Sequence, residues 1–370
     1  MAKFSCAAFL LLCVNASLRA DETTSIDSSP RYKAPKQPHV VVDPAGQIHL
    51  TFGSETSIYY SVSTDQGKNF DEPMLVAKPT KLALGMRRGP RVAVSGKSIM
   101  LSAITGELGG GKDGDLTLWL SKDQGNTWSE PTKINDQAAS AREGLHAMVA
   151  NDKRADCVWL DLRNKRTELW LSTSTDQGTT WSKNTLVYQS PEKSICECCH
   201  PSLCYDARGN LVVMWRNSIA GKRDMYLTTQ REDGTFASAM KLGSGSWDLN
   251  ACPMDGGSLA LKADGKLVTV WRRDSDLLMT QDDPTSEQPL GPGLQPVVAA
   301  TEKGAFMAWI SKRPGELLLL DPAQKKPLRI ADRANDPALA SSVKPGAPLV
   351  LAWEQQTKGQ ASIFIRTVVP

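Results

Sequence analysis

Three short segments of the chain match one another closely: Ser63-Thr64-Asp65-Gln66-Gly67-Lys68-Asn69-Phe70, Ser121-Lys122-Asp123-Gln124-Gly125-Asn126-Thr127-Trp128 and Ser174-Thr175-Asp176-Gln177-Gly178-Thr179-Thr180-Trp181. A degenerate fourth copy runs from Thr228 to Phe236, and the copies start 58, 53 and 54 residues apart. Each copy follows a run of alternating apolar and polar residues, which is typical of a strand. The Asp side chain can bond to the backbone two residues on, and Gly accepts a positive φ. Each copy is therefore predicted to form a hairpin turn, and its role is structural.

A second repeat is a predicted strand that ends in an aromatic residue, at Phe52, Trp159, Trp215, Trp271, Trp309 and Trp353. Together the two patterns divide the chain into seven units, which begin near residues 39, 90, 145, 200, 255, 296 and 337. No segment shows a helical period. Repeats of roughly 40 to 55 residues with about four short strands each are typical of a β-propeller. We therefore expect an all-β fold of four-stranded blades, seven if every unit is one blade, with six as the alternative.

The propeller is expected to be a single domain over residues 39–370, because each blade buries its faces on its neighbours. Residues 21–38 form an N-terminal segment that can supply the last unit with its fourth strand and so close the ring. Residues 1–20 resemble a signal peptide, with Lys3, an apolar run from Phe4 to Val14 and small residues up to Ala20. That run is too short to span a bilayer. We therefore expect an exported protein, periplasmic or extracellular, without a membrane span.

The charge pattern narrows the range of partners. The formal net charge is +3, and no block of Lys and Arg is longer than two residues. Nucleic-acid-binding proteins carry a concentrated basic patch, which is absent here. The expected partner is therefore a small molecule or a glycan.

The Ser-x-Asp-x-Gly-x-Thr-Trp copies resemble the Asp-boxes, or BNR repeats, of the sialidase (neuraminidase) superfamily. The resemblance implies a β-propeller whose Asp-boxes lie on outer turns, away from the active site. Sialidases use three arginines to hold the carboxylate of sialic acid, a Tyr–Glu pair as the nucleophile and an Asp as the acid/base. Their first arginine lies in an Arg-Ile-Pro motif that this chain lacks, and the nearest segment is Gly89-Pro90-Arg91.

Four arginines are candidates for a clamp around a ligand carboxylate. Arg91 starts the inner strand of the second unit, and the other three follow inner strands: Arg163, Arg216 and Arg272. Guanidinium groups bind carboxylates through two parallel hydrogen bonds. The four side chains are therefore predicted to bind a ligand at the channel mouth.

Three of the four histidines fall at or next to one repeat position. His39 and His146 match Arg91 when the units are aligned, and His200 lies two residues before the matching Ser202. Because equivalent positions of a propeller converge on its axis, these side chains are expected to lie near one another. Imidazoles can hold copper or zinc, act as a general base or bind an anion with Arg91. They can equally form a simple polar network with water, and all these interpretations stay open.

The segment Cys196-Glu197-Cys198-Cys199-His200 concentrates cysteines at the same channel mouth. One interpretation is structural disulfides, with Cys252 well placed to pair with Cys198 or Cys199. A second is a copper or zinc site in which Cys196, Cys198 or Cys199 joins His200 and Met254. The third is a redox-active thiol pair. The spacing matches no standard zinc motif, so the sequence leaves the three open.

Asp255, next to Gly256 and Gly257, lies at the equivalent position of the fifth unit and is a candidate acid/base or a simple turn residue. The two glycines suggest a close approach of the backbone. Three classes of function remain: a ligand or metal site lined by His, Cys and Arg, a glycosidase of the exo-sialidase type, and a non-catalytic propeller that binds a glycan or a protein. The sequence does not decide whether the protein is an enzyme.

Overall fold

The structure is a computed structural model that describes residues 23–368, and within this range every regular element is a strand. The all-β prediction is therefore confirmed. The predicted signal peptide, residues 1–20, lies outside the described residues. Among residues 23–368 no helix has the length and apolar character needed to cross a membrane.

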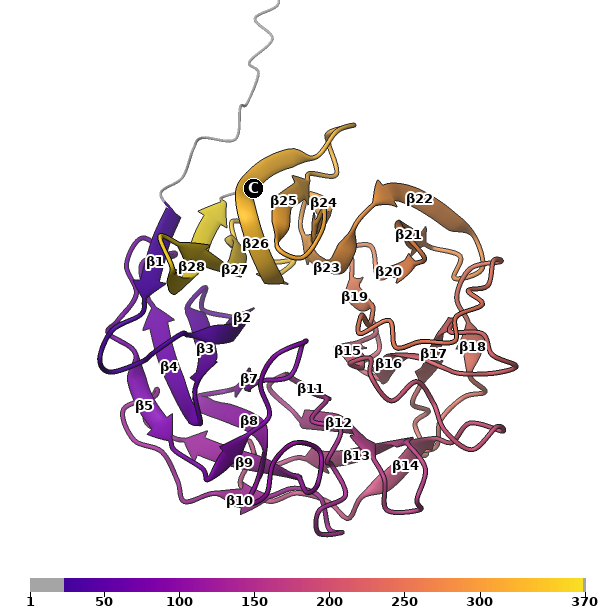
Figure 1. Cartoon of the computed structure of the whole chain (residues 1–370), viewed down its shortest axis with the longest axis horizontal. Helices are drawn as coiled ribbons and strands as arrows, with labels where there is room; N and C mark the ends of the chain where they lie inside the picture. The colour runs from indigo at the N-terminus through magenta and orange to yellow at the C-terminus, as the bar shows by residue number, and fades with distance from the viewer. Residues whose placement is uncertain (1–22, 369–370) are drawn as a thin grey trace, which may run out of the picture.

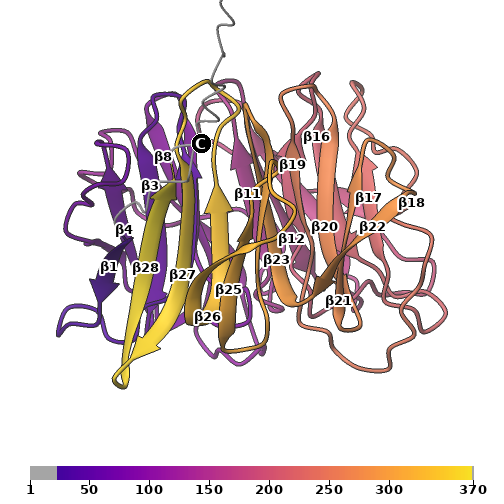
Figure 2. The ribbon, with the colours of Figure 1, turned by 90° about the horizontal axis from the view of Figure 1, so that it is seen from above.

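The strands form antiparallel sheets arranged in a ring, as Figure 1 shows down the ring axis. In the side view of Figure 2 the sheets stand next to one another around that axis. The innermost strands of the successive repeat units are β2 (Lys36–Val42), β7 (Arg91–Ser95), β11 (His146–Ala150), β15 (Ser202–Tyr205), β19 (Ser258–Leu261), β23 (Leu294–Thr301) and the C-terminal part of β26 (Leu328–Ala340).

Five sheets contain one repeat unit each, and their further strands follow in chain order towards the outside. These strands are β3 (Ile48–Ser54), β4 (Ser57–Ser63) and β5 (Met74–Ala77); β8 (Ser98–Gly106), β9 (Asp115–Ser121) and β10 (Thr132–Lys133); β12 (Ala155–Asp161), β13 (Glu168–Ser174) and β14 (Thr185–Tyr188); β16 (Leu211–Arg216), β17 (Met225–Thr229) and β18 (Met240–Lys241); β20 (Leu267–Arg273), β21 (Asp276–Gln281) and β22 (Glu287–Pro292). A two-residue strand, β6 (Lys81–Leu82), pairs with the end of β8.

The sixth sheet has seven strands and holds the repeat units predicted to begin near residues 296 and 337. Its further strands are β24 (Gly304–Ile310), β25 (Gly315–Leu320), β27 (Leu349–Thr357), β28 (Gln360–Val368) and β1 (Thr23–Asp27). The two units share β26, which pairs with β25 up to Ala334 and with β27 from Ala334 onwards. The outermost strand is β1, which pairs with β28, so the two ends of the described chain lie side by side (Figure 1).

The hydrophobic core lies between neighbouring sheets. Met100 and Leu116 of one sheet, for example, pack in one buried cluster with Cys157 and Trp159 of the next. Both faces of each sheet are therefore covered, and β12 is buried at every position. Strands that are covered on both faces are expected to be apolar almost throughout.

The three Asp-box turns link neighbouring repeat units. In the third copy, Oγ of Ser174 donates to Asp176 (2.8 Å) and accepts from the backbone N–H of Gly178 (2.8 Å). Gly178 has a φ of +88°, and a Cβ built there would lie 2.6 Å from the sulfur of Met100 on β8. In the same way Gly125 abuts Tyr60 of the first unit. Each box glycine thus provides both a left-handed backbone and a close contact with the preceding unit.

Candidate functional site

A cavity of about 220 Å³ lies at the ring axis, where the innermost strands begin. Its polar walls come from strands far apart in the sequence, namely Gln37 and His39 on β2, Arg87 and Arg91 before and on β7, His200 before β15, Ser258 on β19 and Asp336 on β26. The ring therefore brings Arg91, His39 and His200 to one cavity, and it adds Arg87, Gln37 and Asp336.

The start of the innermost strand has a recurring local structure that the sequence interpretation missed. Gln37, Gln295 and Asp336 each precede a proline, and their φ angles are +55°, +54° and +46°. At each of these places the pairing register with the next strand shifts. Non-glycine residues with positive φ are uncommon and cluster at functional sites. The repeated residue-proline pair before an inner strand was the available signal.

Two buried guanidinium groups line the cavity without an acidic contact partner. Arg87 donates to the carbonyl oxygens of Pro337 (2.7 Å) and Gln295 (3.3 Å), and Arg91 donates to that of Pro90 (3.0 Å). Neither side chain forms an ion pair within residues 23–368. Burial, followed by repulsion from Arg87, lowers the pKa of Arg91 to about 10, so both groups are charged at neutral pH. Asp336 and Asp255 attract Arg87 from beyond contact distance, so neither guanidinium group has a directly bonded counterion. A buried charge without such a partner is costly, which makes this cavity favourable for an anion.

The three histidines surround Arg91 and are uncharged. Burial, with repulsion from Arg91 and Arg87, lowers the pKa of His39 to about 3. Burial and repulsion from Arg91 hold the pKa of His146 well below its ordinary value. Burial and repulsion from Arg87, Arg91 and Arg216 do the same for His200. Nδ1 of His39 accepts from the backbone N–H of Val92 (3.2 Å). His146 is fully buried behind the cavity wall, with Nε2 2.9 Å from the hydroxyl of Ser102.

The other predicted arginines lie outside the cavity. Arg163 forms ion pairs with Asp161 (2.9 Å) and Asp136 (2.8 Å) and stacks on Trp170. Its charge is thus balanced by Asp161 of its own repeat unit and by Asp136 of the preceding one, and the structure does not bring it to Arg91.

Arg216 and Arg272 lie on the ring of Trp247, with guanidinium carbons 5.2 and 5.3 Å from its centroid. Arg216 is 1% exposed and donates to the carbonyl oxygens of Asp255, Arg223 and Arg272. These contacts tie the fourth and fifth units together, so Arg216 supports the site from behind.

Three carboxyl groups lie beside the cavity and are linked by glutamine side chains. Oδ2 of Asp255 accepts from the backbone N–H of Gln295 (2.8 Å), while its Oδ1 is buried without a partner. Burial raises the pKa of Asp255. The close approach expected beside Asp255 is present, since a Cβ on Gly256 would lie 2.4 Å from the carbonyl oxygen of His200.

Asp336 accepts from Nε2 of Gln295 (2.6 Å) and from Arg313 (2.6 Å). Glu354 accepts from the backbone N–H of Gln37 (2.6 Å), and burial together with repulsion from Asp336 raises its pKa to about 7. Glu354 therefore carries a proton for part of the time at neutral pH.

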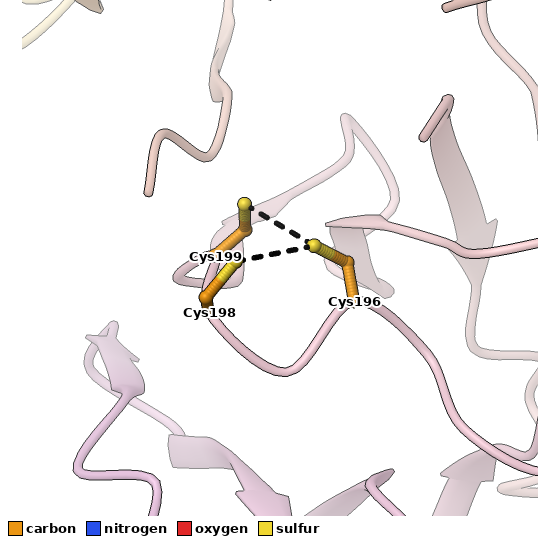
Figure 3. A group of neighbouring side chains, drawn as sticks. All are labelled: Cys196, Cys198 and Cys199. Carbon is orange, nitrogen blue, oxygen red and sulfur yellow. Dashed lines mark hydrogen bonds between the residues drawn. The ribbon is translucent and has the colours of Figure 1, made fainter. Parts of the chain in front are cut away.

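The cysteines of the Cys196 segment form a group of their own. The sulfur of Cys196 lies 3.6 Å from that of Cys198 and 3.5 Å from that of Cys199, and all three side chains are buried (Figure 3). All six cysteines of residues 23–368 are free thiols. The three sulfurs lie within 4.8 Å of one another, and no histidine nitrogen belongs to this group of described residues.

A family model described as a BNR repeat-like domain matches residues 88–270. A search of curated proteins found no match.

Three solved structures share the fold at low sequence identity. An α-L-arabinofuranosidase of family GH93 from Fusarium graminearum, in complex with arabinobiose, is 12% identical, with 93% of this chain and 98% of that chain covered and a TM-score of 0.56. An α-L-arabinanase from Penicillium chrysogenum complexed with arabinobiose is 14% identical, with coverages of 93% and 98% and a TM-score of 0.54. A sialidase from Trypanosoma rangeli is 13% identical, with coverages of 94% and 60% and a TM-score of 0.52.

The repeats, the ring of sheets and these matches agree: residues 88–270 match a BNR repeat-like domain, and the chain has the β-propeller fold of sialidase-like proteins. The resemblance drawn from the Asp-boxes is thereby confirmed. Identities of this size establish the fold and leave the chemistry to be argued from the site.

Proposed function

We propose that this protein is an exported propeller that binds a small carboxylate-bearing ligand, most simply an acidic sugar, in the cavity at the ring axis. The observation that carries the proposal is the pair of buried guanidinium groups, Arg87 and Arg91, which line the cavity with carbonyl contacts only. A ligand carboxylate would supply the missing counter-charge through charge-assisted hydrogen bonds.

The remaining cavity wall suits a polar ligand with hydroxyl groups. The neutral imidazoles of His39 and His200 can each donate or accept a hydrogen bond, and Gln37 can do both. The volume of about 220 Å³ is below the roughly 300–1,000 Å³ of drug-sized pockets, which favours a single sugar unit or a small acid. Similar solved structures were obtained with arabinobiose, so the fold accommodates sugars at least in those proteins.

A calorimetric titration tests this binding function. We would compare N-acetylneuraminic acid, glucuronic acid and neutral arabinobiose, each with the unmodified protein, Arg91→Ala and the control Arg208→Ala, whose side chain is 78% exposed. We expect an acidic sugar to bind and Arg91→Ala to weaken it by roughly 10- to 100-fold, because a hydrogen bond to a charged group contributes about 1.5–3 kcal/mol. Equal binding by both variants, or no binding of any acid, would contradict the proposal.

Glycoside hydrolysis is the second candidate, favoured by the Asp336–Glu354 pair. Two carboxyl groups of which one has a raised pKa are the arrangement that glycosidases use for acid and base roles. The sialidase variant of this chemistry needs a Tyr–Glu pair, and none of the six tyrosines, all within residues 23–368, lines the cavity. Fluorogenic sialosides and arabinosides test the activity, with Glu354→Gln as the variant that should abolish turnover while retaining ligand binding.

Export is a separate part of the proposal and rests on the N-terminal sequence. Intact mass and N-terminal sequencing of the protein recovered from the exported fraction would show whether cleavage occurs between Ser17 and Ala20. Retention of residues 1–20 on a protein found inside the cell would overturn it.

A further inference from the structure

The sulfur atoms near the channel mouth form a cluster that is separate from the hydrocarbon core. Cys196, Cys198 and Cys199 are 1%, 6% and 1% exposed, and their one apolar packing partner in the cluster of described residues is Met254. Cys252 is exposed, and its neighbour Cys198 raises its pKa. Four sulfur-bearing side chains from two segments therefore pack together, with Cys252 near them.

Two other buried cysteines show what an ordinary core thiol looks like in this protein. Cys157 packs in a cluster with Met100, Leu116 and Trp159, and burial raises its pKa well above the ordinary value. Cys204 packs against Val212 and Leu227, and burial raises its pKa to about 12. Cys196 differs, because its sulfur lies within 3.6 Å of the sulfurs of Cys198 and Cys199, and the three side chains form a buried cluster of their own, apart from the hydrocarbon core. Three buried sulfurs this close together offer a set of soft ligands to one metal ion.

The spacing of the three sulfurs matches that of ligands around one ion. Cys196 lies 3.5 and 3.6 Å from its two partners. Sulfurs bound to a tetrahedral ion through bonds of about 2.3 Å lie roughly 3.8 Å apart. In Figure 3 the side chain of Cys196 points towards Cys198 and Cys199, and dashed lines join its sulfur to theirs.

Backbone contacts hold the segment in place from both sides. The N–H of Ile195 donates to Thr167 (3.0 Å) and that of Cys196 donates to Arg216 (3.1 Å). Met254, on the facing segment, has a φ of +54° that directs this segment towards the thiols. Metal sites depend on such support from surrounding groups.

We propose that Cys196, Cys198 and Cys199 bind one Cu(I) ion, with the thioether of Met254 as a further soft neighbour. Thiolate and thioether sulfur together select Cu(I), whereas zinc in proteins takes thiolate, imidazole or carboxylate ligands. Binding releases the proton of each thiol whose sulfur coordinates the ion as thiolate. The site is distinct from the axial cavity and does not depend on the proposed ligand.

The test is a titration of the full chain with Cu(I), carried out without oxygen on the reduced protein against a chromophoric Cu(I) chelator. The variants are Cys198→Ser and Cys199→Ser, and the matched controls are Cys157→Ala and Cys204→Ser, with circular dichroism to check that each folds. X-ray absorption of the copper complex provides a second readout, because sulfur and nitrogen ligands scatter differently.

We expect one equivalent of Cu(I) with sulfur ligands alone. Loss of a residue that only supports a metal ligand lowers metal affinity roughly 10- to 100-fold, so Cys198→Ser and Cys199→Ser, which remove a ligand, should lower the affinity for Cu(I) by more than that. Both controls should bind Cu(I) like the unmodified chain. Equal affinity in the cluster variants, nitrogen in the ligand shell, or zinc binding in the absence of Cu(I) binding would each overturn the proposal. So would a disulfide among these three cysteines in protein purified from the exported fraction, shown by mass spectrometry.

Discussion

Gln295 and Asp336 exchange two hydrogen bonds across the boundary between two repeat units. Nε2 of Gln295 donates to Oδ1 of Asp336 (2.6 Å), and the backbone N–H of Asp336 donates to Oε1 of Gln295 (2.9 Å). Both residues are almost fully buried and both have positive φ angles. This pair connects the start of β23 to the inner part of β26, and it sets the position of one wall of the axial cavity.

The first prediction concerns that pair. Gln295→Leu leaves a buried carboxylate oxygen and a buried N–H of Asp336 without partners, and we expect a loss of about 1–3 kcal/mol in the free energy of unfolding. Urea denaturation measures it, with Gln324→Leu in an exposed turn as the control, expected to change stability by less than about 0.5 kcal/mol. Equal midpoints for the two variants would show that the pair contributes nothing to stability.

The second prediction is a pH dependence at Glu354. Its pKa in the folded state is about 7, above its ordinary value of 4.5, so the folded protein binds more protons than the unfolded chain between these values. Stability contributed by the protonated form is therefore fully present below pH 4.5 and is lost as the pH rises to about 7. Glu354→Gln removes this loss, because a neutral amide can still accept from Gln37.

At pH 4 Glu354→Gln and the unmodified protein should have similar free energies of unfolding. At pH 8 the free energy of unfolding of the variant should be higher by an amount on the order of 1–3 kcal/mol, since one pKa unit corresponds to about 1.4 kcal/mol. Unfolding by urea at pH 4, 6 and 8 measures the difference. Glu130→Gln on the exposed surface is the control. A constant difference across the three pH values would exclude the raised pKa.

The third prediction separates two roles of the Asp-box glycine. Gly178 and Gly209 have nearly equal φ angles of +88° and +86°, but a Cβ on Gly178 meets Met100 at 2.6 Å, and one on Gly209 meets nothing within 4 Å. Gly209→Ala should lower the free energy of unfolding by about 1–2 kcal/mol, because it introduces backbone strain alone. Gly178→Ala should cost roughly 1–3 kcal/mol more because of overpacking against the neighbouring unit.

Thermal unfolding of both variants, with and without Met100→Ala, checks this reasoning. The smaller side chain at position 100 should recover part of the loss in Gly178→Ala and none of it in Gly209→Ala. If the two alanine variants were equally stable, the contact between units would have no energetic role.

The fourth prediction distinguishes Arg163 from Arg91. Arg163→Ala removes the ion-pair partner of Asp161, which is fully buried, and we expect a loss of about 3 kcal/mol, at the low end for a buried pair because Ser140 and Trp159 still donate to Asp161. Affinity for an acidic sugar should be unchanged in Arg163→Ala and reduced in Arg91→Ala. Urea denaturation and calorimetric titration of both variants measure these effects. Reduced affinity in Arg163→Ala with unchanged affinity in Arg91→Ala would show that Arg163, and not Arg91, binds the ligand.

Local features of the sequence were sufficient to predict the fold. The Asp-box needs only Ser174, Asp176 and Gly178 within five residues, and the aromatic strand ends, such as Trp159, recur at the spacing of the repeat units. Turn chemistry and strand alternation act over a few residues, so they are visible in a single sequence.

The cysteine cluster was also visible in part, because Cys196, Cys198 and Cys199 lie within four residues and must be near one another in any fold. The sequence left disulfide, metal and redox interpretations open, and Cys252 and Met254 reach the cluster only through the packing of the fifth unit on the fourth.

By itself the sequence determined a ring of repeated antiparallel units, and with it the convergence of His39, Arg91 and His200 on one axis. Tertiary structure alone decided which arginine has a counter-charge. Arg163 and Arg91 were both predicted to belong to the ligand clamp, but Arg163 meets Asp161 and Asp136, whereas Arg91 meets only carbonyl oxygens. The physical reason is that ion pairing and desolvation depend on distances of a few ångströms between units, and those distances exist only once the ring has closed.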